Sequence, residues 1–97
     1  SRKYTEVIEN AGILIFNFPN FALLYNIRGV AAARLDRLPY ALENYQQAIE
    51  HNPKYAEAHN NMGNVLRNNG QLREAILSYD RAIVIDPKHE EYPIILE

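Results

Sequence analysis

The chain has 97 residues, of which 47% are hydrophobic and 23% charged, a composition typical of a folded domain or of part of a larger one. A formal net charge of −2 argues against broad electrostatic binding to nucleic acid or to an anionic membrane surface. The absence of cysteine excludes disulfides, thiolate metal sites and cysteine nucleophiles. Every apolar run is far shorter than the roughly 20 residues of a membrane-spanning helix, so we expect no membrane insertion.

The first predicted element is a helix over residues 4–18, which Pro19 follows. Apolar side chains lie nearly all round this helix, so we expect it to have neighbours on more than one side. They are Val7, Ile8, Ala11, Ile13, Leu14, Ile15, Phe16 and Phe18.

Two further helices are predicted over residues 21–35 and 39–51, separated by a turn at residues 36–37. Pro39 stands where a proline is tolerated in the first turn of a helix, and Pro53 ends the pair.

The following segment repeats this arrangement. A first apolar stripe with helical spacing consists of Ala58, Met62, Val65 and Leu66. Gly70 suits a left-handed position just after the helix, and a second apolar stripe over residues 72–83 ends before Pro87. Residues 90–97 are expected to begin one more helix.

Shifting the chain by 34 residues superimposes these elements, as expected of an internal repeat. The identical pairs are Ala22/Ala56, Asn26/Asn60, Gly29/Gly63, Leu38/Leu72, Ala41/Ala75, Tyr45/Tyr79, Ala48/Ala82, Ile49/Ile83, Pro53/Pro87 and Lys54/Lys88. The register divides the chain into four parts. Residues 1–21 correspond to the second helix of an earlier unit, 22–55 and 56–89 are full units, and 90–97 begin a third unit or form a terminal helix.

The pattern resembles the tetratricopeptide repeat family, whose units of the same length are helix-turn-helix pairs. The matching residues are Tyr25, Gly29, Ala41, Tyr45, Ala48 and Pro53 in the first unit, and Met62, Gly63, Leu66, Ala75, Tyr79, Ala82 and Pro87 in the second. The sequence departs from the family at Arg28, Ala32 and His59, where Leu, a larger residue and an aromatic residue are usual. The resemblance implies an all-α, right-handed superhelical solenoid of antiparallel helix pairs that acts as a protein–protein interaction scaffold.

Glycine and tyrosine have predicted structural roles in both units. Gly29 and Gly63 lack a side chain that would separate paired helices, so we expect close crossings there. Tyr45 and Tyr79 are expected to fill the wedge between units, with each hydroxyl bonded or exposed.

The resemblance places a binding site for a peptide or partner protein on the concave face, which the first helix of each unit lines. The candidate residues are Leu23, Asn26, Ile27, Val30, Arg34, Glu57, Asn60, Asn61, Asn64, Arg67 and Asn68. Asparagine amides both donate and accept, so they can pair with a peptide backbone, and the two arginines can meet an acidic group. A solvated polar face is the alternative for the asparagines.

The second unit also resembles repeats of O-linked N-acetylglucosamine transferase and of bacterial proteins in which such repeats precede a transferase domain. Asn61 and Asn64 match the inner-face asparagines that bind peptide backbone in the eukaryotic enzyme, but the first unit has Ile27 and Val30 there. This resemblance keeps open a second hypothesis, a substrate-recruiting arm of a larger glycosyltransferase or sulfotransferase.

Nothing in the sequence predicts catalysis. The three histidines lack metal-ligand spacing, the acidic pairs lack a partner base, and no glycine-rich loop precedes a lysine. We therefore predict a protein that is not an enzyme and has no catalytic residue, no metal site and no cofactor.

The two ends are predicted to self-associate, because repeat solenoids need polar terminal units and these ends are apolar. The candidate residues are Ile13, Ile15, Phe16, Ile94, Ile95 and Leu96. A homo-oligomer formed through the uncapped ends is the third hypothesis, and a cytoplasmic location is the expectation for all three.

Overall fold

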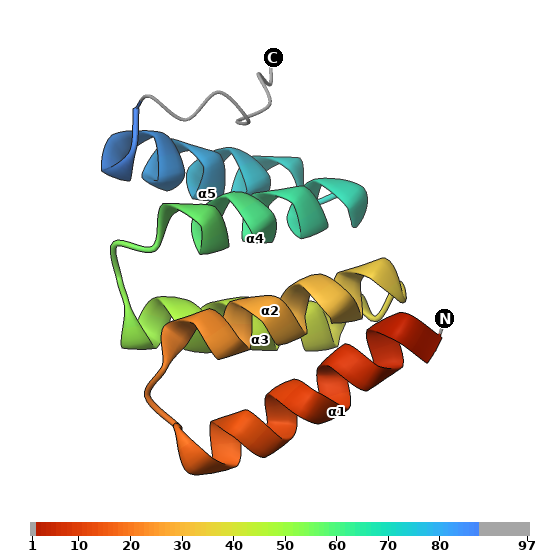
Figure 1. The fold of residues 1–97 in the computed structure, drawn as a ribbon. Coiled ribbons are helices and arrows are strands. Elements are labelled where there is room, and N and C mark those ends of the chain that lie inside the picture. Colours follow the sequence, from red (N-terminus) through yellow and green to blue (C-terminus); the bar gives the residue numbers. More distant parts are fainter. Residues whose placement is uncertain (1, 88–97) are drawn as a thin grey trace.

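The computed structural model describes residues 2–87, which fold into α-helices without any strand (Figure 1). The helices are α1 (Arg2–Asn17), α2 (Ala22–Arg34), α3 (Leu38–His51), α4 (Ala56–Asn68) and α5 (Leu72–Ile85). Each helix packs against the next one in the chain, so the helices stack in sequence order. The predicted all-α helical solenoid is confirmed. We call α2–α3 the first pair and α4–α5 the second pair.

The close helix crossings predicted at glycine are present in both pairs. A Cβ atom built on Gly29 would lie 2.6 Å from Cε1 of Tyr45, and one built on Gly63 would lie 2.6 Å from Cε1 of Tyr79. A tyrosine ring of the second helix therefore occupies the space that a side chain on the first helix would need. Alanines without any exposed surface allow close packing elsewhere between the helices; they are Ala32, Ala41, Ala48, Ala58, Ala75 and Ala82.

The turns within the two pairs use the same backbone conformation with different residues. Gly70 has a φ of 81°, which confirms its predicted left-handed position. Asp36, at the equivalent position of the first pair, has a φ of 59°. Because a side chain disfavours this region, the first turn is strained where the second is not.

The departures from the family pattern at Arg28 and His59 both have partners. Nε of Arg28 donates to Oδ1 of the buried Asn44 at 2.6 Å, and Nδ2 of Asn44 donates to the Tyr40 carbonyl at 2.8 Å. His59 is buried and lies 3.2 Å from the Pro53 carbonyl through Nε2. His59 thus takes the place of an aromatic residue in the packing.

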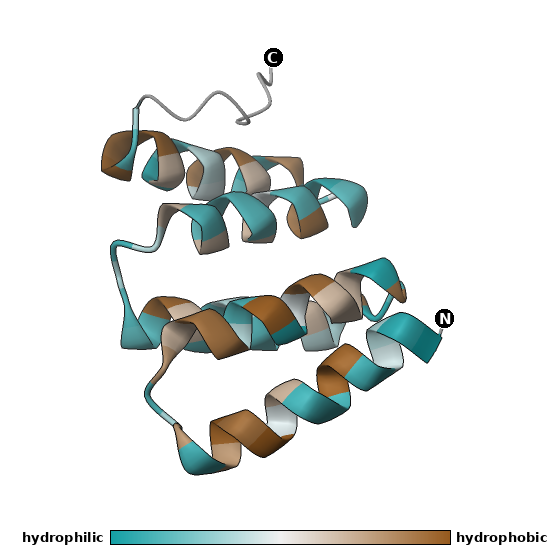
Figure 2. Cartoon of the chain, viewed as in Figure 1, coloured by the Kyte–Doolittle hydropathy of each residue, from teal (hydrophilic) through white to brown (hydrophobic). Residues whose placement is uncertain are grey.

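The N-terminal helix α1 packs on α2 with only part of its apolar surface. Ile8 and Ile15 contact the core, whereas Ile13 and Phe16 are 63% and 86% exposed. Figure 2 shows the apolar ribbon in the C-terminal half of this helix. None of the helices from α1 to α5 is long and apolar enough to cross a membrane.

Candidate functional site

A groove of about 330 Å³ lies between the first pair and α4. The first pair contributes Val30, Ala33, Arg34, Asp36, Leu38 and Tyr45, and α4 contributes Asn61, Asn64, Val65, Arg67 and Asn68. Six of the predicted binding residues therefore meet here: Val30, Arg34, Asn61, Asn64, Arg67 and Asn68.

Two asparagines of the groove already make a hydrogen bond within the protein. Oδ1 of Asn64 accepts from the Tyr79 hydroxyl at 2.6 Å, and Nδ2 of Asn61 donates to Oδ1 of Asn26 at 3.1 Å. The amide N–H groups of Asn64 and the carbonyl oxygen of Asn61 have no recorded partner within residues 2–87. Each side chain is thus restrained by one hydrogen bond, and its other polar group remains without a partner among the described residues.

Two predicted binding asparagines are not at the surface. Asn26 is buried between the pairs, where its Nδ2 donates to Oε2 of Glu57 at 3.5 Å. Asn60 is only 6% exposed, and its Oδ1 has no hydrogen-bond partner in the described part of the chain. Asn26, at the equivalent position of the first pair, instead makes hydrogen bonds to Glu57 and Asn61 of the next repeat. Neither Asn26 nor Asn60 lines the groove, so their placement differs from the expectation of an accessible amide.

Arg34 and Arg67 give the groove its positive charge. Both side chains are exposed, and the described residues provide neither with an ion pair. Burial raises the pKa of the Tyr45 hydroxyl well above its usual range, although the nearby Arg34 opposes the shift. Burial likewise raises the pKa of Tyr79, against the opposing charge of Arg67. The tyrosine hydroxyls beside the groove therefore stay neutral at physiological pH, and the arginines are its cations.

Some predicted residues lie apart from the groove. Leu23 and Ile27 are exposed on α2 but do not line it. At the N-terminal end, Ile13 and Phe16 are accessible, whereas Ile15 packs inside the molecule against a cluster of Tyr25, Ala48 and Ala58. Ile94, Ile95 and Leu96 lie outside the described residues.

The groove also contains residues that the sequence did not single out as binding residues, namely Ala33, Asp36, Leu38, Tyr45 and Val65. Leu38, Asp36 and Tyr45 belong to the turn and to the second helix of the first pair. A prediction confined to the first helix of each pair misses these three residues, because none of them lies on a first helix. In residues 2–87 no group of three His, Cys, Asp or Glu side chains is placed to hold a metal ion.

A family model described as tetratricopeptide repeat matches residues 44–76, which run from the second helix of the first pair into the second pair. A comparison with curated proteins gives no match. Many solved structures are similar to the chain.

Three of these structures illustrate the likeness. The crystal structure of MamA is 31% identical with a TM-score of 0.79, over 82% of this chain and 47% of that chain. The first TPR of Spaghetti (RPAP3) bound to the HSP90 peptide SRMEEVD is 26% identical with a TM-score of 0.89, over 93% and 71%. The Arabidopsis OM64 TPR domain, at 18% identity and a TM-score of 0.89 over 92% and 74%, shows the shared fold.

The present chain spans about half the length of the MamA chain. Its likeness to a domain bound to a peptide supports a protein-interaction module.

Proposed function

We propose that this chain, a member of the tetratricopeptide repeat family, binds an extended acidic segment of a partner protein in the groove between its two helix pairs. The observation that carries this proposal is the convergence on one groove of three asparagines and two arginines that have no ion pair within residues 2–87. Amides recognise a peptide backbone, and guanidinium groups recognise carboxylates.

The asparagines are suited to hold backbone. The N–H groups of Asn64 face a carbonyl of the bound segment, and the carbonyl oxygen of Asn61 accepts from a backbone N–H. Their internal bonds to Tyr79 and Asn26 restrict both side chains before binding, so less conformational entropy is lost when the peptide arrives.

The arginines select for negative charge. Arg34 and Arg67 come from different pairs, so a carboxylate between them contacts both sides of the groove. Asp36 also lines the groove and disfavours a second carboxylate close to it. The peptide bound to the similar Spaghetti domain, SRMEEVD, is acidic and serves as a probe of this chemistry.

The test is a calorimetric titration of the chain with the peptide SRMEEVD at low and at physiological salt. Arg34→Glu with Arg67→Glu should weaken binding at least tenfold, because two attractive contacts become repulsive. Arg73→Glu is the matched control, since Arg73 is exposed on α5 and does not line the groove. No binding by the unmodified chain, or equal weakening by both variants, would contradict the proposal.

The exposed apolar face of α1 favours a second candidate function, association through the N-terminal end. Ile13 and Phe16 are adjacent on this face and largely exposed. Sedimentation over micromolar to millimolar concentration tests this candidate. Ile13→Lys should shift any oligomer toward the monomer, because a buried lysine is costly to desolvate, while Leu72→Lys on exposed α5 surface should not. A strict monomer throughout the range would exclude it.

A further inference from the structure

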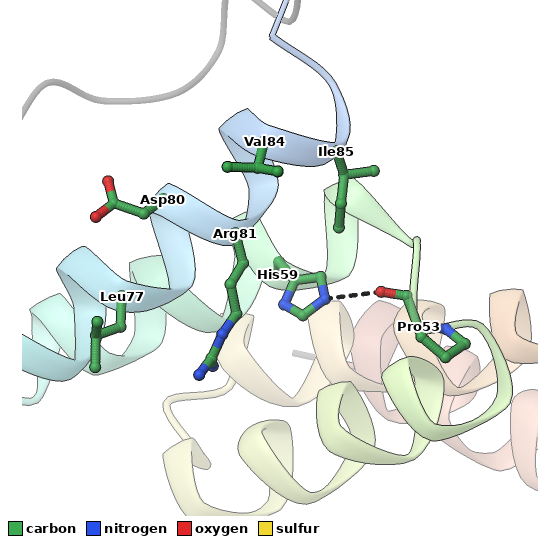
Figure 3. Close-up of a pocket in the computed structure, with 7 residues that line it drawn as sticks. All are labelled: Pro53, His59, Leu77, Asp80, Arg81, Val84 and Ile85. Atoms are coloured by element: carbon green, nitrogen blue, oxygen red, sulfur yellow. Dashed lines mark hydrogen bonds between the residues drawn. The ribbon is translucent and has the colours of Figure 1, made fainter.

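A second pocket lies in the second pair and shares no residue with the groove. It measures about 380 Å³ and is formed by α5, the start of α4 and the connection before it (Figure 3). The lining residues are Pro53, His59, Leu77, Asp80, Arg81, Val84 and Ile85.

The first pair shows what fills this position when no pocket is present. Tyr25 occupies the place of His59, and its hydroxyl donates to the Pro19 carbonyl at 2.6 Å. His51 occupies the place of Ile85, and its ring stacks on Tyr25 with the centroids 5.1 Å apart and the planes at 21°. Two stacked rings therefore close the first pair.

In the second pair, smaller side chains stand at the positions of both rings. His59 is smaller than tyrosine yet still reaches the equivalent Pro53 carbonyl, 3.2 Å from Nε2. Because a carbonyl only accepts, Nε2 must carry the proton and donate. Ile85 supplies no ring to stack on His59. The pocket is thus the space that the Tyr25–His51 stack takes up in the first pair.

The outer wall of the pocket has apolar side chains at repeat positions where the first pair has charged ones. Leu77 and Val84 replace Glu43 and Glu50 of α3 at the same repeat positions, and they are 55% and 81% exposed. Exposed apolar residues gathered around a pocket mark interaction sites more often than those scattered singly. The substitutions therefore convert a solvated face of the repeat into a surface suited to an apolar partner.

The polar groups of the pocket fit an aromatic ring. Arg81 replaces Gln47, and no ion pair is recorded for its guanidinium within the described ranges. Figure 3 shows the Arg81 side chain running beside His59, while Asp80 points away from both. Nδ1 of His59 is buried and has no hydrogen-bond partner among residues 2–87. A guanidinium group is attracted to the face of an aromatic ring, as where Arg37 lies 4.7 Å from the Tyr40 ring centroid.

We propose that this pocket binds an aromatic side chain, tyrosine in the first place, from a partner protein, and that it is independent of the peptide groove. The ring lies against the Arg81 guanidinium in the pocket, beside the edge of His59, which is itself only 6% exposed. Leu77 and Val84 cover the edge of the ring.

The experiment is an NMR titration of the isotope-labelled chain with N-acetyl-L-tyrosinamide at millimolar concentration. The expected result is saturable shifts at His59, Leu77, Arg81 and Val84, with N-acetyl-L-leucinamide at least fivefold weaker. The absence of saturable shifts at these residues, or equal binding of the leucine compound, would overturn the proposal.

His59→Tyr is the decisive variant, because it rebuilds the ring that fills the first pair. It should abolish binding of the tyrosine compound while leaving SRMEEVD binding in the groove unchanged. If His59→Tyr does not fold, a second variant is used: Leu77→Glu with Val84→Glu, which places the residues of α3 at these exposed positions. This variant should weaken binding of the tyrosine compound at least tenfold. Undiminished binding by a folded variant of either kind would place the ring elsewhere and reject the pocket.

Discussion

In the first pair, Arg28, Asn44 and the Tyr40 carbonyl form a partly buried chain of hydrogen bonds. In the second pair the side chains of Met62 and Ser78 stand at the positions of Arg28 and Asn44, and no such chain is recorded. Both pairs nevertheless keep the same crossing of a glycine with a tyrosine ring. The comparison separates two kinds of position. The glycines, alanines and paired tyrosines fix the helix geometry, and the remaining positions differ in their polar networks, strain and exposed surface.

The largest expected effect comes from breaking the shared crossing with Gly63→Leu. The new side chain would collide with the Tyr79 ring, and overpacking of this kind costs roughly 1–3 kcal/mol or more. We expect a loss in unfolding free energy of about 3 kcal/mol in urea denaturation, and a similar loss for Gly29→Leu. Gly12→Ala is the control, because its Cβ would lie 3.9 Å from the nearest atom, Nη1 of Arg28. An unchanged urea midpoint for Gly63→Leu would contradict the crossing.

Arg28→Met gives the first pair the methionine that the second pair has at the equivalent position, Met62. It leaves Oδ1 of Asn44, a residue 1% exposed, without its donor, at an expected cost of about 2 kcal/mol. Adding Asn44→Ser recreates the Met62 and Ser78 combination and should recover at least half of that cost. A double-mutant cycle by chemical denaturation measures the coupling. Strictly additive costs would show that the two side chains do not depend on each other.

Tyr79→Phe should destabilise more than Tyr45→Phe. The Tyr79 hydroxyl donates to Asn64, and losing this bond should cost about 1 kcal/mol. Val30 stands at the position of Asn64 in the first pair and cannot accept, so Tyr45→Phe should cost clearly less. Thermal unfolding of both variants measures the difference. In the Tyr79→Phe background, a further Asn64→Ala change should cost little, and a full additional loss would indicate another role for the amide.

Asp36→Gly should stabilise the first turn. Asp36 adopts the left-handed conformation that Gly70 adopts in the second turn, and glycine relieves the strain of its side chain. After the larger backbone entropy of unfolded glycine is subtracted, we expect a gain of about 0.5 kcal/mol. The reciprocal Gly70→Asp should lose a similar amount. Differential scanning calorimetry of both variants checks the pair, and shifts of the same sign would refute the equivalence of the two turns.

The smallest expected difference between the two pairs concerns tyrosine ionisation. It does not affect the unfolding free energy at neutral pH and develops only at alkaline pH. Burial raises the pKa values of Tyr45 and Tyr79 above the ordinary 10.0 in the folded chain. Above that pH the unfolded chain loses protons that the folded chain retains, so the unfolding free energy falls as pH rises. Tyr45→Phe should reduce this slope more than Tyr79→Phe, because Tyr45 is the more strongly shifted. Urea midpoints between about pH 9 and pH 11 measure it, and identical slopes for all three proteins would contradict the assignment.

Much of the fold follows from the repeat pattern alone. The helix limits agree with the prediction within about two residues, and the roles of Gly63 and Gly70 are confirmed. These features depend on short-range spacing and on residue size, which a sequence displays directly.

The groove could be predicted only in part. The sequence identified Asn61 and Asn64, but it did not reveal that each already bonds to a buried neighbour. Asn26 and Asn60 are both predicted to line the binding face and yet are buried, and Asn26 faces the next repeat, where it bonds to Glu57 and Asn61. Which amide faces a groove depends on the rotation of α4 against the first pair, and a single helix pattern does not encode that rotation.

The stacking of helices in chain order has a consequence for folding kinetics. Because each helix contacts mainly its chain neighbours, few contacts require distant segments to meet. Chains with such local contacts fold quickly, and any helix pair can serve as the nucleus to which the next helix adds. Amide protons of α3, which is packed between α2 and α4, should accordingly exchange with solvent more slowly than those of α1.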